Sequence, residues 1–265
     1  MSPFGIAWLQ CDGIQFWSRS RHPLDSLEFK PEVDSSVIQL ISGIYQRDPR
    51  WARRIIRHRI STTEPLEESL AGTVKVAARR VQFSMAEVPD FKKSDVEILG
   101  RGHTADRVLE SWVAERMKLR AFVSDSEIWD FLDAMIAAAM GVSPKVVALP
   151  VSAVLLDHDG RVLSWGMNSA WDFRTEHAET NLIRRWYSQG APGVPAALWV
   201  TRKSCKMCAG WIYDAFVRVP GRKQLSIHFR DPDDGPMARL TVLDRGSFES
   251  VRAMSRARGL IHAPG

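Results

Sequence analysis

Residues 150–168 read PVSAVLLDHDGRVLSWGMN, and this stretch decides the fold of the second half of the chain. A nearly continuous apolar run over 146–156 ends in the turn Asp-His-Asp-Gly at 157–160. Residues 161–166 then return as a second apolar run. Two such runs separated by a short turn with Asp and Gly are typical of an antiparallel β-hairpin. The stretch therefore predicts two adjacent strands of one sheet.

A helix is predicted immediately before this hairpin. Ser124 and Glu127 form a capping box, because Ser124 can accept from the third amide while Glu127 reaches back. Apolar residues follow at helical spacing until Gly141 and Pro144 supply the stop. The hairpin is thus preceded by one long amphipathic helix.

Helices and strands alternate after the hairpin. The sequence predicts helices at 177–188, 205–217 and 248–258, and strands at 197–201, 224–230 and 239–243. Repeated helix–strand crossovers after a hairpin indicate a three-layer α/β domain. We expect residues 123–265 to form an α/β/α domain with a mixed five-stranded sheet.

Residues 1–122 are predicted to form a smaller α+β domain of their own. Strands are expected within 5–18 and at 73–83, and helices within 35–60, interrupted near Pro49, and at 104–122. This half shows no catalytic motif, and no internal repeat is visible in the chain. Cys11 has no nearby metal partner and is expected to be a buried, small apolar residue.

Two short motifs stand at the starts of consecutive predicted helices. The first is His177-Ala178-Glu179, and the second is Cys205-Lys-Met-Cys208. A helix N-terminus favours thiolates, and two cysteines three residues apart share one helix face. With His177 they supply three zinc ligands, which is the number that a catalytic zinc site takes from the protein.

Glu179 provides the remaining chemistry of this predicted site. Zinc lowers the pKa of a bound water, and a neighbouring carboxylate can take the proton and pass it to a leaving group. His-x-Glu followed by Cys-x-x-Cys is the signature of zinc-dependent base deaminases. The aromatic side chains Trp171 and Phe173 lie in the loop before His177, where one of them could stack on a flipped base.

From residue 124 onward the chain resembles the cytidine/deoxycytidylate deaminase superfamily, whose pattern is PVGAVxxDxxGxVxxxGxN, HAE and PCxMCxGA. The matching segments here are 150–168, 177–179 and 204–211. The resemblance implies one Zn²⁺ per chain and hydrolytic deamination of a nucleobase. It also implies that Asn168 hydrogen-bonds the target nucleotide and that the Ala178 amide contacts the base.

The chain departs from the family pattern at two positions. Ser204 stands where proline is usual, and the bulky Trp211 replaces a small residue. Both could reshape the pocket, so cytosine, adenine and guanine stay open as the target base. The extra N-terminal half is similar to that of a small bacterial branch of the superfamily, for which an RNA-editing role has been proposed.

The net charge of +5 is concentrated in residues 47–59, RDPRWARRIIRHR. A helix opening at Pro49 would align several of these arginines in one stripe, and Arg matches phosphate geometry. We therefore expect binding of RNA or another single-stranded nucleic acid; a solvated helix face is the alternative. The expected contacts are Arg47, Arg50, Arg53, Arg54, Arg57 and Arg59.

The composition agrees with a globular protein rather than a disordered or membrane-spanning chain. Hydrophobic residues make up 45% of the 265 residues, and no apolar stretch is long enough to span a membrane. Three cysteines and no basic leader favour a reducing cytoplasm. Two other functions stay open: deamination of free nucleosides, nucleotides or bases, and nucleic-acid binding by an inactive zinc fold. Whether the chain forms a homodimer also stays open.

Overall fold

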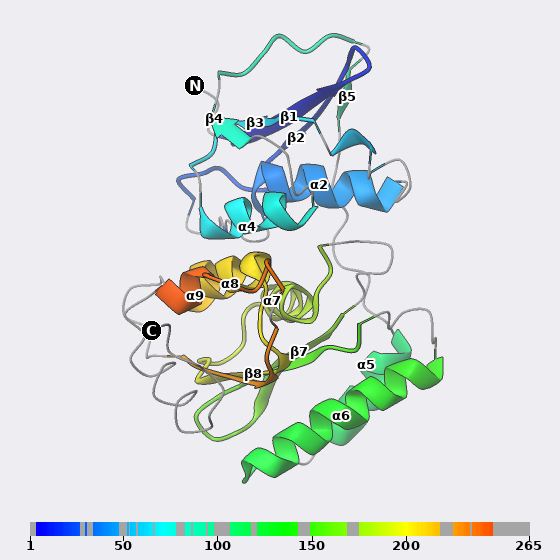
Figure 1. The fold of residues 1–265 in the computed structure, drawn as a ribbon, viewed down its shortest axis with the longest axis vertical. Helices are drawn as coiled ribbons and strands as arrows, with labels where there is room; N and C mark the ends of the chain where they lie inside the picture. The colour runs from blue at the N-terminus through cyan, green and yellow to red at the C-terminus, as the bar shows by residue number, and fades with distance from the viewer. Residues whose placement is uncertain are drawn as a thin grey trace.

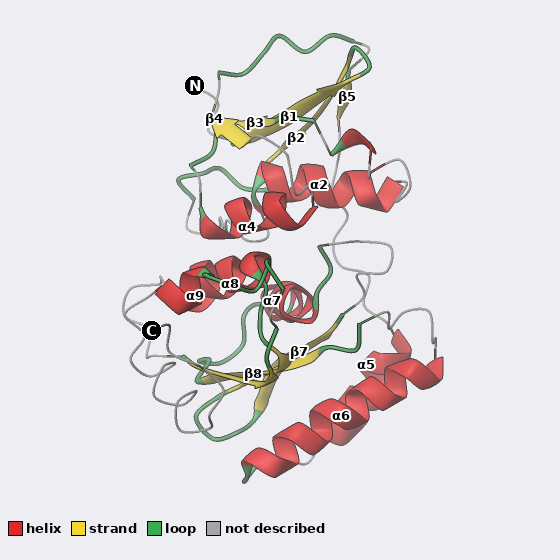
Figure 2. Cartoon of the chain, in the orientation of Figure 1, coloured by secondary structure: helices red, strands yellow, loops and turns green. Residues whose placement is uncertain are grey.

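A computed structural model provides the structure of the chain (Figure 1). It carries two sheets with helices between them and on one outer face, as the colours of Figure 2 make plain. The residues that it describes are 4–26, 30, 34–47, 52, 54–56, 58–65, 67–77, 83–85, 87–93, 95–97, 107–117, 121–142, 149–168, 175–217, 225–233 and 235–245.

The sheet of the second half contains the predicted hairpin. Its described strands are β6 (Ser152–Leu156), β7 (Val162–Met167), β8 (Ala197–Arg202) and β9 (Ser226–Asp231), in the order β7-β6-β8-β9. Strand β6 pairs antiparallel with β7 and β8, whereas β8 and β9 are parallel. The prediction of a mixed sheet is thus confirmed, and the two central strands, β6 and β8, are almost fully buried.

The described part of this sheet has four strands rather than the expected five. The strand expected at 239–243 is wrong, because 236–240 form turns and Val242–Arg245 forms the short helix α9. Thr241 and Asp244 cap each other there: the Thr241 amide donates to Asp244 Oδ2 at 3.0 Å, and the Asp244 amide to Thr241 Oγ1 at 3.3 Å. This reciprocal cap starts a helix where the apolar pattern favours a strand. The helix expected at 248–258 lies outside the described residues.

Helices cover both faces of this sheet, which gives the expected three layers (Figure 2). Helices α5 (Arg107–Met117) and α6 (Asp125–Val142) lie on one face. Helices α7 (Ala178–Ser188) and α8 (Lys206–Ile212), the latter continued by the π-helical turn η1 (Tyr213–Val217), lie on the other. The capping box of α6 forms largely as predicted, because the Glu127 amide donates to Ser124 Oγ at 3.4 Å while the Glu127 carboxylate accepts from the Val123 amide at 3.0 Å.

The described residues of the first half include a second sheet and, before α5, two longer helices. Its strands are β1 (Ile6–Cys11), β2 (Ile14–Arg19), β3 (Ile60–Thr62), β4 (Phe83–Met85) and β5 (Val96–Glu97), in the order β4-β3-β1-β2-β5. The helices are α2 (Ser36–Arg47) and α4 (Glu68–Ala77). The hairpin β1–β2 confirms the strands expected within 5–18, and Cys11 is buried as expected.

The strand expected at 73–83 is wrong, because most of its first half belongs to helix α4. The β-branched residues Thr73 and Val74 favour a strand locally. In the structure both are buried, and the Thr73 hydroxyl donates to the Ser69 carbonyl one turn earlier, at 2.7 Å. Packing on the second half of the chain therefore overrides local propensity.

Helices α2 and α4 of the first half face α7 and α8 of the second half (Figure 1). One buried apolar cluster runs through all four helices, with Ile41, Leu70, Leu182 and Met207 among its members. The two halves thus share a hydrophobic core instead of meeting at a polar surface. The boundary at residue 122 stays a prediction; α5, which precedes it, packs on α6.

Asp214 ties η1 to the first turn of α4, and this buried carboxyl should make stability depend on pH. Its Oδ2 atom accepts a hydrogen bond from the Ser69 amide at 2.9 Å. Burial, with a smaller contribution from Glu68, raises the pKa of Asp214 above its ordinary value. The folded protein therefore holds this proton to higher pH than the unfolded chain does, so this group's stabilisation is lost as pH rises.

We expect Asp214→Asn, which keeps an acceptor oxygen for the Ser69 amide, to remove this contribution. Relative to wild type, the variant should gain stability as pH rises from about 4, the ordinary Asp pKa, through the folded pKa. Urea unfolding of both proteins over that range measures the difference. A constant difference between wild type and variant would contradict the prediction.

Candidate metal and active site

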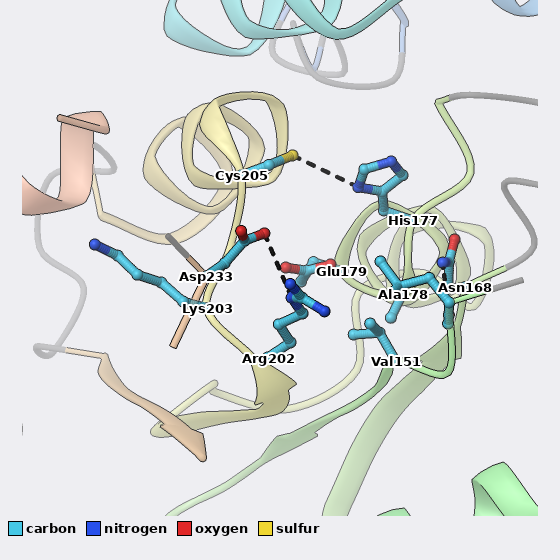
Figure 3. A pocket seen from close by; sticks show the side chains of 10 residues that line it. Val151, Asn168, His177, Ala178, Glu179, Arg202, Lys203, Cys205 and Asp233 are labelled. Atoms are coloured by element: carbon cyan, nitrogen blue, oxygen red, sulfur yellow. Dashed lines mark hydrogen bonds and ion pairs between the residues drawn. The ribbon is translucent and has the colours of Figure 1, made fainter. Parts of the chain in front are cut away.

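The first turns of α7 and α8 bring the predicted metal ligands together. His177 is the N-cap of α7 and Cys205 the N-cap of α8, and both have extended backbone, with φ −77° and −73°. An N-cap side chain leaves the helix at its amino end, where unpaired amides favour anions. His177 and Cys205 therefore point toward one another from neighbouring helices (Figure 3). Cys208 lies within the first turn of α8 and is fully buried.

The three side chains form a triangle that fits a zinc ion. His177 Nδ1 lies 3.5 Å from each sulfur, and the two sulfurs lie 3.7 Å apart. With Zn–S near 2.3 Å and Zn–N near 2.0–2.1 Å, a tetrahedral site needs edges of about 3.6 Å between nitrogen and sulfur and about 3.8 Å between sulfurs. These three residues could therefore hold a metal ion.

The electrostatics of Cys205 agree with a metal ligand, whereas burial raises the pKa of the Cys208 thiol well above its ordinary value. The pKa of Cys205 lies well below its ordinary value, because it shares a hydrogen bond with Cys208 and lies next to His177. Thiolate is the form of cysteine that binds metals. Within the described residues, Cys11 is the one other cysteine, and it lies far away in β1.

Glu179, the second residue of α7, lies beside this triangle. Its side chain is only 3% exposed, and this burial raises the pKa of the carboxyl above its ordinary value. The Cys205 thiolate raises it further, while His177 lowers it. Glu179 is thus a desolvated carboxyl next to the candidate metal position and lines the same pocket.

A close approach of strand β7 fixes the first turn of α7. A Cβ added at Gly166 would overlap the carbonyl oxygen of Ala178, so only glycine allows this contact. The Asn181 side chain donates to the Met167 carbonyl at 2.8 Å, which adds a polar link between the same two elements. Together these contacts hold His177 and Glu179 in place above the sheet.

A pocket opens beside the candidate ligands at the ends of β7 and β8 (Figure 3). Asn168, which follows β7, lines it together with Ala178, and a role of either residue in substrate binding stays a prediction. The Asn168 side chain donates to the Leu149 carbonyl at 2.8 Å, and this bond orients its amide. Trp171 and Phe173 lie outside the described residues.

The comparison with known families agrees with this geometry. Residues 148–254 match the Bd3614-like deaminase family. This match agrees with the resemblance of the second half of the chain to the cytidine/deoxycytidylate deaminase superfamily. The pocket lies in the part of the chain that this deaminase family model matches, which supports an enzyme of the deaminase class.

Two solved structures are similar to part of the chain. One comes from a study of A-to-I editing by tRNA:A34 deaminases at the wobble position of transfer RNA. It is 26% identical to this chain, with a TM-score of 0.32, and the match covers 53% of this chain and 96% of that chain. The other is a diaminohydroxyphosphoribosylaminopyrimidine deaminase/5-amino-6-(5-phosphoribosylamino)uracil reductase from Thermotoga maritima. It is 22% identical, with a TM-score of 0.30, over 46% of this chain and 34% of that chain. No curated protein matches the chain.

Three charged residues of the deaminase pocket were not expected from the sequence. Arg202 is the last residue of β8, Lys203 follows it, and Asp233 follows β9, so all three stand at the carboxyl ends of two parallel strands. Arg202 Nε pairs with Asp233 Oδ2 at 3.4 Å inside the pocket (Figure 3). Ligands commonly bind at this edge of α/β sheets. The order of the strands could therefore have indicated these pocket residues, which belong to none of the sequence motifs.

The arginine-rich segment lies in the first half, away from the deaminase motifs. Arg47, Arg54 and Arg59 are exposed, whereas Arg50, Arg53 and Arg57 lie outside the described residues. Arg54 pairs with Asp12 at 2.9 Å, and an Arg47 guanidinium nitrogen lies 3.4 Å from the Glu97 carbonyl. The predicted continuous stripe therefore stays a prediction. No helix among the described residues has the length and apolar character that crossing a bilayer requires.

Proposed function

We propose that the chain is a zinc-dependent enzyme that hydrolytically deaminates a nucleobase within RNA. The observation that carries the proposal is the ligand triangle of His177, Cys205 and Cys208, whose edges match tetrahedral zinc, with the buried Glu179 carboxyl beside it. A structural zinc site fills four protein positions, so a three-residue triangle favours catalysis.

In the proposed reaction, zinc and Glu179 have different roles. When bound, zinc supplies a water that is acidic enough to attack a base near neutral pH. Glu179 takes the proton of the attacking water and delivers it to the departing amino group, which leaves as ammonia. Its burial suits this role, because a desolvated carboxyl accepts a proton more readily than an exposed one.

Asn168 and Ala178 orient the target nucleotide in this proposal. Both line the pocket, and the bond from Asn168 to the Leu149 carbonyl holds its amide in one orientation. Fixed donors and acceptors cost no reorganisation when the base arrives. Trp171 and Phe173 stay candidates for stacking on the base.

A phosphate-bearing substrate is favoured over a free base by the charges near the pocket. Arg202 and Lys203 line it, paired with Asp233 at 3.4 Å and with Asp244 at 3.0 Å, and a guanidinium and an ammonium group are the side chains that contact phosphates. The segment 47–59 adds further exposed arginines, including Arg47, Arg54 and Arg59. We therefore place RNA ahead of free nucleosides as the substrate.

Ammonia release tests this function. Zinc-loaded protein is incubated with single-stranded RNA, with the matching DNA, and with a panel of free nucleosides, nucleotides and bases. We expect ammonia from RNA, and binding that weakens steeply with added salt because phosphate contacts release counterions. Release from the free compounds alone would favour a metabolic deaminase, and full zinc occupancy with no release from any substrate would overturn the proposal.

A further inference from the structure

Four strands of the first sheet, β1 to β4, repeat the connectivity of the four described strands of the second, whereas β5, beside β2, has no counterpart among them. In the first half, the hairpin β1–β2 is followed by α2, by β3 antiparallel to β1, by α4, and by β4 parallel to β3. In the second half, the hairpin β6–β7 is followed by α7, by β8 antiparallel to β6, by α8, and by β9 parallel to β8. The strand orders β2-β1-β3-β4 and β7-β6-β8-β9 are therefore equivalent.

Individual hydrogen bonds repeat as well. The Ile6 amide donates to Thr63 Oγ1 at 3.0 Å, and its counterpart, the Ser152 amide, donates to Thr201 Oγ1 at 3.1 Å. Both bonds join the first strand of a half to the third. Such agreement in side-chain detail goes beyond a shared strand order.

The ends of the second strands repeat in the same way. The Ser20 amide donates to the Gly5 carbonyl at 2.8 Å, as the Asn168 amide does to the Val151 carbonyl at 2.9 Å. Ser20 therefore occupies the place of Asn168 in the first half.

Helices α4 and α8 contact each other reciprocally. A Cβ added at Gly72, four residues after the first residue of α4, would overlap the carbonyl oxygen of Lys206, the first residue of α8. A Cβ added at Gly210, four residues into α8, would overlap the carbonyl oxygen of Glu68, the first residue of α4. When each element presents the same patch to the other, the interface has twofold symmetry.

Equivalent residues also meet each other across this interface. Thr73 follows Gly72 and Trp211 follows Gly210, and the Trp211 indole nitrogen donates to Thr73 Oγ1 at 3.0 Å. Residues that lie on a twofold axis must pair with their own counterparts. Trp211 is fully buried in this contact and does not line the deaminase pocket, so its bulk serves the interface.

The first half lacks every residue of the catalytic signature. The cap of α2 is Ser35, because the Gln39 amide donates to its carbonyl as the Asn181 amide does to that of His177. These bonds and the two glycines align the two halves residue by residue. In this alignment, Ser35 and Val37 stand at the positions of His177 and Glu179. Glu67 and Leu70 stand at the positions of Cys205 and Cys208, and Ser20 at that of Asn168.

Glu64 fills the space beside the cap of α2. Its carboxylate accepts from the Ser35 hydroxyl and, at 2.7 Å, from the Ser36 amide. The side chain is 1% exposed and lies against Gly5, where an added Cβ would overlap it. A buried carboxylate bonded to the helix start thus stands where the second half opens its pocket.

We propose that residues 4–97 are a second, catalytically degenerate copy of the deaminase fold, which acts as the built-in partner of the active copy. Across the pseudo-twofold interface it holds α8, the helix that carries Cys208 and is capped by Cys205. The metal site of the second half therefore depends on α4 of the first. Because α4 covers this face of α8, a homodimer of the chain has to use another surface.

Alanine substitutions at the two reciprocal glycines test this coupling in the full chain. We expect Gly72→Ala and Gly210→Ala to weaken zinc binding to a similar degree, by about tenfold or more, as the loss of support for a ligand does elsewhere. Gly141→Ala in α6 is the control, because a Cβ there meets no atom within 4 Å. Affinity is measured by competition with a chromogenic chelator, without substrate.

A second pair of variants covers the case in which the glycine variants do not fold. Thr73→Val and Trp211→Phe each remove one side of the same hydrogen bond, and we expect the double variant to lose no more zinc affinity than the worse single one. Wild-type zinc affinity in Gly72→Ala or in Thr73→Val would overturn the coupling. The proposed reaction would be untouched by that result, because ammonia release is measured separately.

Discussion

Replacing Glu179 with glutamine should abolish ammonia release while the protein keeps its zinc. The amide has nearly the same shape as the carboxyl, which is 3% exposed beside His177 and Cys205, so the variant can fold around it. It cannot accept the proton of the attacking water. Proton transfer by a positioned group contributes about 10²–10⁴-fold, so we expect kcat to fall by at least about 10²-fold.

Zinc content and single-turnover ammonia release from RNA distinguish this result from a folding defect. Glu127→Gln is the control, because it makes the same chemical change at the N-terminus of α6, outside the pocket. Wild-type turnover in the Glu179 variant would refute the proton-shuttle role. Loss of zinc together with activity would instead show that Glu179 supports the metal site.

The second half of the chain could be predicted from the sequence, because the residues that carry its proposed chemistry also set the local backbone structure. His177 and Cys205 are helix caps as well as candidate ligands, so one short motif sets both the backbone and the site. The turn at 157–160 fixes the hairpin through bonds of its own, such as that from the Gly160 amide to the Asp157 carbonyl at 3.2 Å. Each of these features depends on residues close together in the sequence.

The features that escaped prediction depend on residues far apart. Helix α4 contains the strand-forming residues Thr73 and Val74, yet it packs as a helix on α8, and the partner of Thr73 in this contact, Trp211, lies 138 residues further along the chain. The repeat of the fold cannot be recognised from sequence similarity between the halves, because Ser35 and Leu70 stand where the second half has the candidate metal ligands His177 and Cys208. Burial patterns and a few backbone bonds preserve the repeated topology, and many sequences satisfy them.

Replacing Cys208 with serine should strongly weaken metal binding. Cys208 is fully buried, and its sulfur lies 3.5 Å from His177 Nδ1 and 3.7 Å from Cys205 Sγ, so no other described side chain can take its corner of the triangle. A serine hydroxyl is a much poorer zinc ligand than a thiolate. We expect zinc affinity to fall by at least about 10²-fold. This loss is larger than the loss expected when a residue that only supports a metal ligand is changed.

Cys11→Ser provides a matched control for this loss. Cys11 is 3% exposed in β1 of the degenerate copy, so the substitution places the same hydroxyl in a buried position without touching the triangle. The control variant should bind one zinc ion per chain, and cobalt substituted for zinc should keep its thiolate charge-transfer absorption. That absorption should weaken in Cys208→Ser and should disappear when Cys205 is changed as well. Undiminished cobalt absorption in Cys208→Ser would exclude this cysteine as a ligand, and the chain would then need another group to hold the metal beside Glu179.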